Sequence, residues 1–322
     1  MMLVFVIMAM VVVVSQSYTT SHHRIDIGNN ITMPVLTLGT GGWNDTLAED
    51  AVVLALKSGF DAVHAAFDYF NLKGVGRGIA QSGRRRADIF VTAMTSPCFH
   101  NTSKPYRNVT DPLKCQALTE KEVDMTLQEL GLEYADLMLL HGPNEPFGFI
   151  GTCDAKANEL NLAQWKAYEN KLRQGRTRAI GVSNYCPSCL DAFQNEDIQP
   201  VVNQIQLHVG MGEDPEGLLR YCEKHSIVVQ AYSPLAAGGV VSDPLCSSVG
   251  AKYNKTAAEV GLRWIVRREN VAVVVKASSH VYMAQDLGVF DWDLSDKDVD
   301  RLNQATTPKG QQDGRPSWGC TA

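Results

Sequence analysis

Apolar and polar positions along this chain follow the pattern of short buried strands separated by amphipathic helices. Eight runs rich in β-branched and other apolar residues recur at intervals, and a helical pattern follows each. Several runs are apolar at nearly every position, which is typical of parallel strands covered by helices on one side and packed inside on the other. The predicted strands are Val35–Gly39, Phe60–Ala66, Asp88–Met94, Ala135–His141, Arg178–Ser183, Val201–Leu207, Ile227–Tyr232 and Val271–Lys276.

Helical periodicity fills the intervals between these strands. The clearest segments are Leu47–Ser58, Leu118–Leu130, Leu162–Gln174, Glu216–His225 and Ala257–Arg268. Thr119, with Glu122 three residues later, predicts a capping box, and Gly175 suits a helix end. Eight strand–helix units in succession predict an α/β protein with a single (β/α)8 TIM barrel. Arg24–Leu36, with Gly28-Asn29-Asn30 at its centre, predicts a β-hairpin ahead of the first barrel strand.

The net charge and the first residues of the chain limit its expected partners and cellular location. A formal net charge of -6 and a pI near 5.8 argue against nucleic acid or an anionic membrane as partner. Residues 1–14 form a continuous apolar run, too short to span about 30 Å of hydrocarbon as a helix, so no stable membrane span is expected. Residues 1–17 are predicted to be a signal peptide. A basic segment before the apolar run is missing, which leaves a short anchor as the alternative.

Five Asn-x-Ser/Thr sequons agree with the predicted signal peptide, because N-glycans are added only in the secretory pathway. The sequons are at Asn30, Asn44, Asn101, Asn108 and Asn254. The sequence therefore predicts a secreted or lumenal protein with N-glycans at some of these sites.

Eight cysteines fit an oxidising compartment. Cys98 and Cys115 bracket a segment with two sequons and two prolines, which favours a disulfide between them. Cys186-Pro-Ser-Cys189 has the spacing of a redox motif, but no thioredoxin-like pattern surrounds it, which disfavours catalysis there. The sequence does not pair the other four cysteines, Cys153, Cys222, Cys246 and Cys320. No Cys/His cluster has structural zinc spacing, so no metal is expected.

Chemically distinctive residues stand at the carboxyl ends of the predicted strands, where functional residues of such barrels gather. They are His64, Tyr69, Met94, His141, Ser183, Asn184, Gln204, His208 and Tyr232. Tyr69 and two histidines at one barrel mouth could move protons to or from a carbonyl or hydroxyl group. Each residue alone equally suits a structural, hydrogen-bonded role, so it is the convergent set that favours chemistry.

A series of short segments surrounds these positions in a specific order and spacing. They are Leu38–Gly41, Gly59–Asn71, Asp88–Thr92, Asp136–Pro143, Gly181–Asn184, Val202–Gln204, Ala231–Leu235 and Leu287–Asp298. Their order and spacing resemble the aldo-keto reductase family from about Arg24 to Asn303, and the barrel domain is taken as residues 24–322. The resemblance implies an enzyme that binds NADP(H) in an extended form across the barrel mouth. It also implies carbonyl reduction with a tyrosine acid beside a lysine–aspartate pair and a histidine.

Two of the four catalytic positions implied by the resemblance depart from the family pattern. Tyr69 and His141 match the tyrosine and the histidine, whereas His64 stands at the aspartate position and Met94 at the lysine position. Replacing both charged residues leaves no unpaired buried charge, while replacing one would cost several kcal/mol. Without the ammonium, the pKa of Tyr69 is expected near about 10 or higher, a poor match for acid catalysis at neutral pH. A protonated His64 would replace that charge in part, so turnover is expected to be slow or absent.

The resemblance also divides the cofactor positions into two ends. Ser183, Asn184 and Gln204 match residues at the nicotinamide carboxamide, and Tyr232 matches the residue stacked on its ring. Ser183 and Asn184 also suit a purely structural role at a strand end. Lys276 matches the lysine at the 2′-phosphate. Around it, Ala277, Tyr282, Gln285 and Asp286 replace the serine, the arginine and the Glu-Asn pair of the family. Tyrosine cannot give the bidentate contact of arginine, and an aspartate repels phosphate. NADP(H) binding is therefore expected to be weakened, with NAD(H) or another ligand as the alternative.

Three functions stay open at this stage. The first is an aldo-keto reductase-like oxidoreductase for a small carbonyl or alcohol, using NADP(H) or NAD(H). The second is a redox-neutral isomerase, dehydratase or cyclase that uses His64, Tyr69 and His141 without a cofactor. The third is a non-catalytic barrel that binds a small molecule. All three involve a small-molecule partner and a chain expected to be monomeric.

Two regions outside the strands also bear on the site. Phe99–Lys114 reads as an insertion on the side where the family shapes its substrate pocket. The C-terminal tail, with Trp318 and Cys320, is expected over the barrel mouth, where Trp318 either covers the mouth or anchors the tail.

Overall fold

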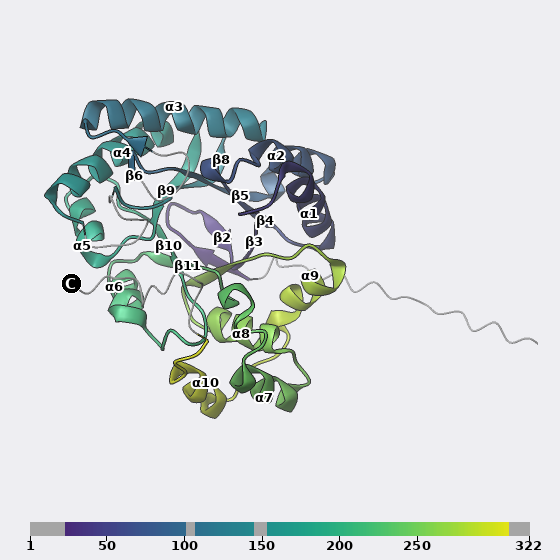
Figure 1. Cartoon of the computed structure of the whole chain (residues 1–322). Coiled ribbons are helices and arrows are strands. Elements are labelled where there is room, and N and C mark those ends of the chain that lie inside the picture. Colours follow the sequence, from purple (N-terminus) through teal and green to yellow (C-terminus); the bar gives the residue numbers. More distant parts are fainter. Residues whose placement is uncertain (1–22, 101–106, 145–152, 309–322) are drawn as a thin grey trace, which may run out of the picture.

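The computed structural model describes residues 23–100, 107–144 and 153–308. Its centre is a closed barrel of eight parallel strands in the order β3-β4-β5-β8-β9-β10-β11-β12 (Figure 1). All eight predicted runs form barrel strands, with ends that differ by no more than two residues. The strands are β3 Leu36–Gly39, β4 Ala62–Ala66, β5 Phe90–Thr95, β8 Ala135–Leu140, β9 Thr177–Ser183, β10 Val202–Gln206, β11 Val228–Tyr232 and β12 Val271–Val275. The predicted (β/α)8 barrel is confirmed.

Helices surround the barrel and connect successive strands (Figure 1). They are α1 Asp45–Ser58, α2 Leu72–Gln81, α3 Pro112–Leu130, α4 Ala155–Arg173, α5 Pro187–Leu190, α6 Leu218–Lys224, α7 Pro244–Tyr253, α8 Ala257–Val266, α9 His280–Leu287 and α10 Asp296–Asn303. Local capping explains several starts, because a side-chain oxygen at the N-cap accepts from an otherwise unpaired amide. Asn44 caps α1 by accepting from the Leu47 amide. Thr256 and Glu259 form a capping box at α8.

The predicted capping box at Thr119 and Glu122 is wrong. Helix α3 begins earlier, at Pro112, and the Asp111 side chain caps it by accepting from the Lys114 amide. Proline at the first helical turn costs no hydrogen bond, so this start is favoured. Glu122 lies in mid-helix, is buried, and accepts from the Ser96 amide at 2.6 Å.

The N-terminal hairpin is confirmed and closes one end of the barrel. Strands β1 (Arg24–Asp26) and β2 (Thr32–Pro34) pair antiparallel, and Gly28 at the turn has a φ of +88°. Ile27, Ile31 and Met33 of this hairpin pack with apolar residues at the starts of barrel strands. The amino end of the barrel is therefore filled, and chemistry is left to the carboxyl end.

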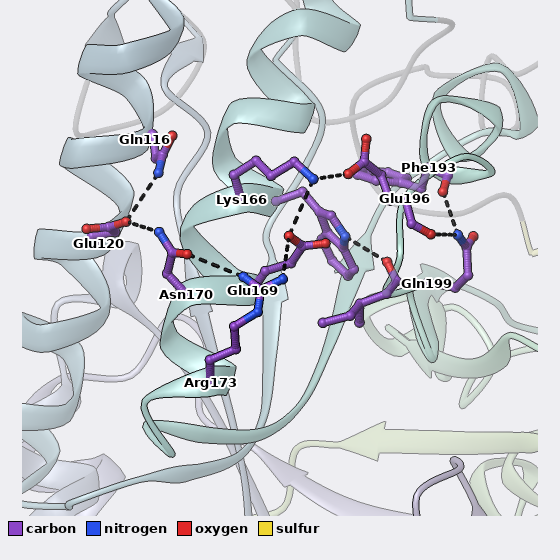
Figure 2. Close-up of polar contacts among 11 residues, drawn as sticks. Gln116, Glu120, Lys166, Glu169, Asn170, Arg173, Phe193, Glu196 and Gln199 are labelled. Carbon is purple, nitrogen blue, oxygen red and sulfur yellow. Dashed lines mark hydrogen bonds and ion pairs between the residues drawn. The ribbon is translucent and has the colours of Figure 1, made fainter.

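Polar contacts join α4 to its neighbours on the outside of the barrel (Figure 2). Asn170 of α4 donates to Glu120 of α3 at 2.8 Å, and Lys166 pairs with Glu196 in the segment after α5. The first contact holds α3 and α4 side by side, and the second ties α4 to the segment after α5.

The predicted disulfide between Cys98 and Cys115 is present. It closes the insertion, whose described part pairs β6 (Phe99–His100) with β7 (Arg107–Asn108). Arg107 forms a buried ion pair with Glu122 of α3, so the base of the insertion is held by charge as well as by the disulfide.

A second disulfide joins Cys153 to Cys189. The Cys186–Cys189 spacing therefore does not mark a redox pair, because Cys189 bonds to a cysteine 36 residues away and Cys186 is also disulfide-bonded. Cys222 and Cys246 are buried free thiols.

In the described ranges, no helix has the length and apolar character needed to cross a bilayer. The predicted leader (residues 1–17), the sequon at Asn101, and Trp318 and Cys320 of the tail lie outside the described residues.

Candidate active site

A cavity of about 800 Å³ lies at the carboxyl ends of the barrel strands, and we call it the mouth cavity. Seven of the predicted site residues line it: His64, Tyr69, His141, Ser183, Asn184, Gln204 and Tyr232. Lys276 also lines it, at the end of β12. The fold thus brings together residues from β4, β8, β9, β10, β11 and β12 that are far apart in the sequence.

Tyr69 is the last residue of the short 3-10 turn η2 (Phe67–Tyr69) that directly follows β4. Its ring is held on one side by the loop after β3, which Asn71 ties down by donating to the carbonyls of Thr40 and Trp43 at 2.8 and 3.0 Å. Burial raises the pKa of Tyr69 well above its usual value, and the negative charge of Asp68 adds to this effect. The phenol is therefore a weak acid in this site.

His64 is buried in β4, with an exposed fraction of 2%, and its ring lies 5.9 Å from the ring of Tyr69. Burial, together with repulsion from His141, lowers the pKa of His64 to about 3. The imidazole is therefore neutral at physiological pH. The expectation that a protonated His64 replaces part of the missing positive charge is wrong, because burial disfavours the charged form. The Nε2 atom of His64 is buried and has no hydrogen-bond partner within the part of the chain that the structure describes.

Met94 is fully buried in β5, beside β4, and packs in the apolar cluster that fills the barrel interior. It is absent from the lining of the mouth cavity. At this position the protein has hydrocarbon and a thioether where the resemblance implies an ammonium.

His141 follows β8, and its Nδ1 atom lies 2.8 Å from Oδ1 of Asp68. The side chains are 15% and 6% exposed, respectively. Sequence reasoning missed Asp68. Its signal was a carboxylate directly before Tyr69, in a segment that is otherwise apolar from Ala65 to Phe70. A carboxylate that accepts from Nδ1 fixes the tautomer and orientation of an imidazole.

Ser183, Asn184, Gln204 and Tyr232 form one connected polar wall. The Ser183 hydroxyl donates to the Gln204 carbonyl at 2.9 Å, and the Tyr232 hydroxyl donates to Asn184 Oδ1 at 2.9 Å. Asn184 in turn donates to the His141 carbonyl at 2.8 Å and adopts a φ of 65°. The wall is rigid because each member is held by another.

The far end of the mouth cavity is lined by one lysine and one aspartate. Lys276 donates to the Gly41 carbonyl at 2.5 Å, and its Nζ lies 4.9 Å from the centre of the Trp43 ring. Asp286 is buried there, and burial, reinforced by Glu259, raises its pKa to about 8. Tyr282 and Gln285 also line this end, whereas Ala277 is buried and does not.

His208 lies outside the lining of the mouth cavity. Its Nδ1 atom lies 2.7 Å from the Val209 carbonyl oxygen, which gives it a structural role. Among the described residues, no group of three or more His, Cys, Asp or Glu side chains could hold a metal ion.

Comparison with known proteins assigns this chain to a family. The sequence profile described as the Aldo/keto reductase family matches residues 35–307. An aldo-keto reductase of Mycolicibacterium paratuberculosis is 33% identical over 285 residues, which cover 87% of this chain and 90% of the relative. Mycobacterium tuberculosis aldo-keto reductase Rv2971 is 33% identical over 279 residues, which cover 86% and 89%.

Solved structures agree with the sequence match. The crystal structure of an aldo/keto reductase from Brucella melitensis superposes with a TM-score of 0.74 at 29% identity, covering 87% of this chain and 97% of that chain. A Bombyx mori aldo-keto reductase in complex with NADP superposes with a TM-score of 0.71 at 26% identity, covering 87% and 92%.

Proposed function

This chain belongs to the aldo/keto reductase family of oxidoreductases, and we propose that it interconverts a small carbonyl compound and its alcohol with a nicotinamide dinucleotide. The observation that carries the proposal is the meeting of Tyr69 and His141 in the mouth cavity, beside the polar wall of Ser183, Asn184 and Gln204. Proton-exchanging groups and a carboxamide-sized set of polar partners in one cavity are what carbonyl reduction requires.

The described residues fit the nicotinamide end of such a cofactor. Asn184 and Gln204 offer amide groups to a carboxamide, and Tyr232 is held next to them by its bond to Asn184. When bound, the cofactor supplies or accepts the hydride. The protein's own part is to orient the ring against this wall, to exclude water from the mouth cavity and to move one proton.

The phosphate end fits less well. Lys276 is the one Lys or Arg among the described residues that line the mouth cavity, and its ammonium already donates to the Gly41 carbonyl. Asp286, once ionised, would repel a 2′-phosphate. We therefore propose weak binding of NADP(H) and use of NAD(H) by the same wall.

Slow turnover is part of the proposal. The pKa of Tyr69 is raised by burial, Met94 offers no charge to lower it, and the neutral His64 does not replace that charge. Each unit by which the pKa of an acid is raised corresponds to about 1.36 kcal/mol against ionisation. Proton transfer from Tyr69 should therefore be slower than from a tyrosine beside an ammonium.

Direct titration with NADPH and NADH tests the proposal. Trp43 lies against Lys276 at the phosphate end, so tryptophan fluorescence of the full-length glycosylated protein should report binding. We expect micromolar binding of at least one cofactor, followed by carbonyl reduction in a substrate screen. If neither NADPH nor NADH binds at millimolar concentration, the proposed reductase function is rejected. Redox-neutral chemistry at His64, Tyr69 and His141 would then be the hypothesis to test.

We also propose that the protein acts in the secretory pathway. The sequon residues Asn30, Asn44, Asn108 and Asn254 are all exposed, and the disulfides Cys98–Cys115 and Cys153–Cys189 suit an oxidising compartment. Expression in a secreting eukaryotic cell should give a protein whose mass falls on enzymatic removal of N-glycans. Recovery of an unglycosylated protein from the cytosol alone would contradict the proposal.

A further inference from the structure

The most informative unassigned group in the mouth cavity region is the carboxylate of Asp68. It directly precedes Tyr69 in η2 and lies 2.8 Å from Nδ1 of His141. A carboxylate accepts hydrogen bonds and does not donate them, so Nδ1 of His141 is the protonated atom of this pair. Both side chains are largely withdrawn from solvent, which strengthens their interaction and fixes the ring.

We propose that His141 exchanges the reaction's proton with the substrate oxygen, and that Asp68 is the positioning residue that orients His141 for this step. The inference rests on the proposed reductase function and names its proton donor. With Nδ1 bonded to Asp68, the transferred proton leaves from Nε2 of the imidazolium. The N–H bond breaks, its electron pair stays on the ring, and the O–H bond of the product alcohol forms. The hydride that completes the reduction comes from a reduced nicotinamide dinucleotide.

Electrostatics distinguishes the two candidate donors. The negative charge of Asp68 disfavours a phenolate on Tyr69, whose pKa is raised by burial and by this neighbour. The same charge stabilises the positive imidazolium of His141, in the way that a buried aspartate supports a catalytic histidine. One carboxylate thus opposes proton release by Tyr69 and orients His141 for that step.

The geometry also allows Tyr69 to donate a hydrogen bond to the substrate. Its ring meets His141 edge-on, with ring centres 5.6 Å apart at 78°. A substrate oxygen between them can take the proton from His141 and a hydrogen bond from the phenol. The backbone carbonyl of His141 is meanwhile fixed by Asn184 of the polar wall.

Kinetics of four variants tests the roles. His141→Gln should lower kcat on the order of 100-fold, and Tyr69→Phe should lower it less. Asp68→Asn should lower kcat with little change in KM, because the ring of His141 is no longer held in one tautomer and orientation. Asp68→Glu, which keeps the carboxylate, should stay closer to the wild-type kcat. A larger loss in Tyr69→Phe than in His141→Gln, or an unchanged kcat in Asp68→Asn, would overturn the inference.

Asp61→Asn is the matched control. Asp61 precedes the same strand β4 at its opposite end, where Oδ1 lies 2.8 Å from Nη2 of Arg84. It loses a comparable ionic hydrogen bond at the other end of the strand, so its kcat should equal that of the wild type.

A second readout does not depend on turnover. Long-range ¹⁵N–¹H NMR of the histidine rings in the ligand-free protein should show Nδ1 of His141 protonated. In Asp68→Asn the ring should lose this preference for a proton on Nδ1, and an unchanged ring would overturn the inference. A wild type that reduces no carbonyl compound rejects the proposed function and the donor role with it. An active wild type whose His141→Gln variant keeps its rate rejects the donor role alone.

Discussion

Gly41 lies directly against the phenol ring of Tyr69. A Cβ atom at Gly41 would stand 3.0 Å from Cζ and 3.3 Å from the hydroxyl oxygen of Tyr69. These distances are shorter than ordinary van der Waals contact, so a larger residue at position 41 must displace the ring. The loop after β3 therefore sets where the phenol stands in the mouth cavity.

Gly41→Ala should reduce catalysis more than stability. A methyl group here moves the Tyr69 ring by a few tenths of an ångström, which we expect to lower kcat roughly tenfold, because small misplacements of reacting groups are costly. Steady-state kinetics and thermal melts measure the two effects. Gly288→Ala is the control, since a Cβ there meets its nearest atom at 3.7 Å. Equal kinetics for the two variants would mean that Gly41 does not position Tyr69.

Restoring the charged pair implied by the family should raise activity. Met94→Lys alone places an ammonium in a fully buried apolar site and should destabilise the fold by several kcal/mol. Met94→Lys with His64→Asp supplies the partner charge from the adjacent strand β4. The double variant should regain stability relative to Met94→Lys and reduce a carbonyl substrate faster than wild type, because an ammonium lowers the pKa of a neighbouring tyrosine and so lets Tyr69 serve as a second proton donor beside His141.

The double-mutant cycle itself supplies the control. Unfolding free energies of the wild type, both single variants and the double variant should show a favourable coupling between positions 64 and 94. A coupling near zero, or a double variant that binds NADPH and gains no rate, would contradict the assignment of these two positions.

Asp286 should make stability depend on pH. Its pKa is raised to about 8 in the folded chain, first by burial and then by Glu259, while an unfolded aspartate titrates near about 4. The folded state therefore holds the proton more tightly, and this stabilising contribution is complete below about pH 4 and lost as the pH rises to about 8. Asp286→Asn cannot ionise, so its melting temperature should increasingly exceed that of the wild type between those limits.

The matched control for this prediction is Asp300→Asn, at an exposed position of α10. Its melting temperature should differ little from the wild type at any pH. Asp286→Asn should also bind NADPH more tightly relative to NADH at pH 8 than the wild type does. A difference in melting temperature that stays constant with pH would show that Asp286 ionises normally.

The disulfide between Cys98 and Cys115 should stabilise the base of the insertion. It closes a loop with a sequence separation of 17 residues, for which loop-closure entropy predicts about 3 kcal/mol. Replacing both cysteines with alanine should lower the unfolding free energy by roughly this amount, measured by urea denaturation in non-reducing buffer. Under a reductant that opens this bond, the wild type should approach the variant. A persistent difference under reduction would point to packing and not to the covalent link.

Much of the fold follows from the sequence because local pattern and global architecture agree. Each barrel strand is a short apolar run, so Val271–Val275 or Ala135–Leu140 can be recognised without tertiary information. Helix starts were less predictable. Thr119 and Glu122 have the spacing of a capping box, but Glu122 is used in the tertiary structure to hold Ser96 and Arg107, and Asp111 with Pro112 begins the helix instead.

The sequence by itself determined the barrel and the candidate residues at its strand ends, and through the family resemblance it predicts that His64 and Met94 stand where two charged catalytic residues are expected. These are properties of residue type and spacing along the chain. Only the tertiary structure showed the burial that keeps His64 neutral and the contact between His141 and Asp68. Burial sets the first property, and the second is a contact between residues 73 positions apart in the chain. Neither can be predicted from the local sequence.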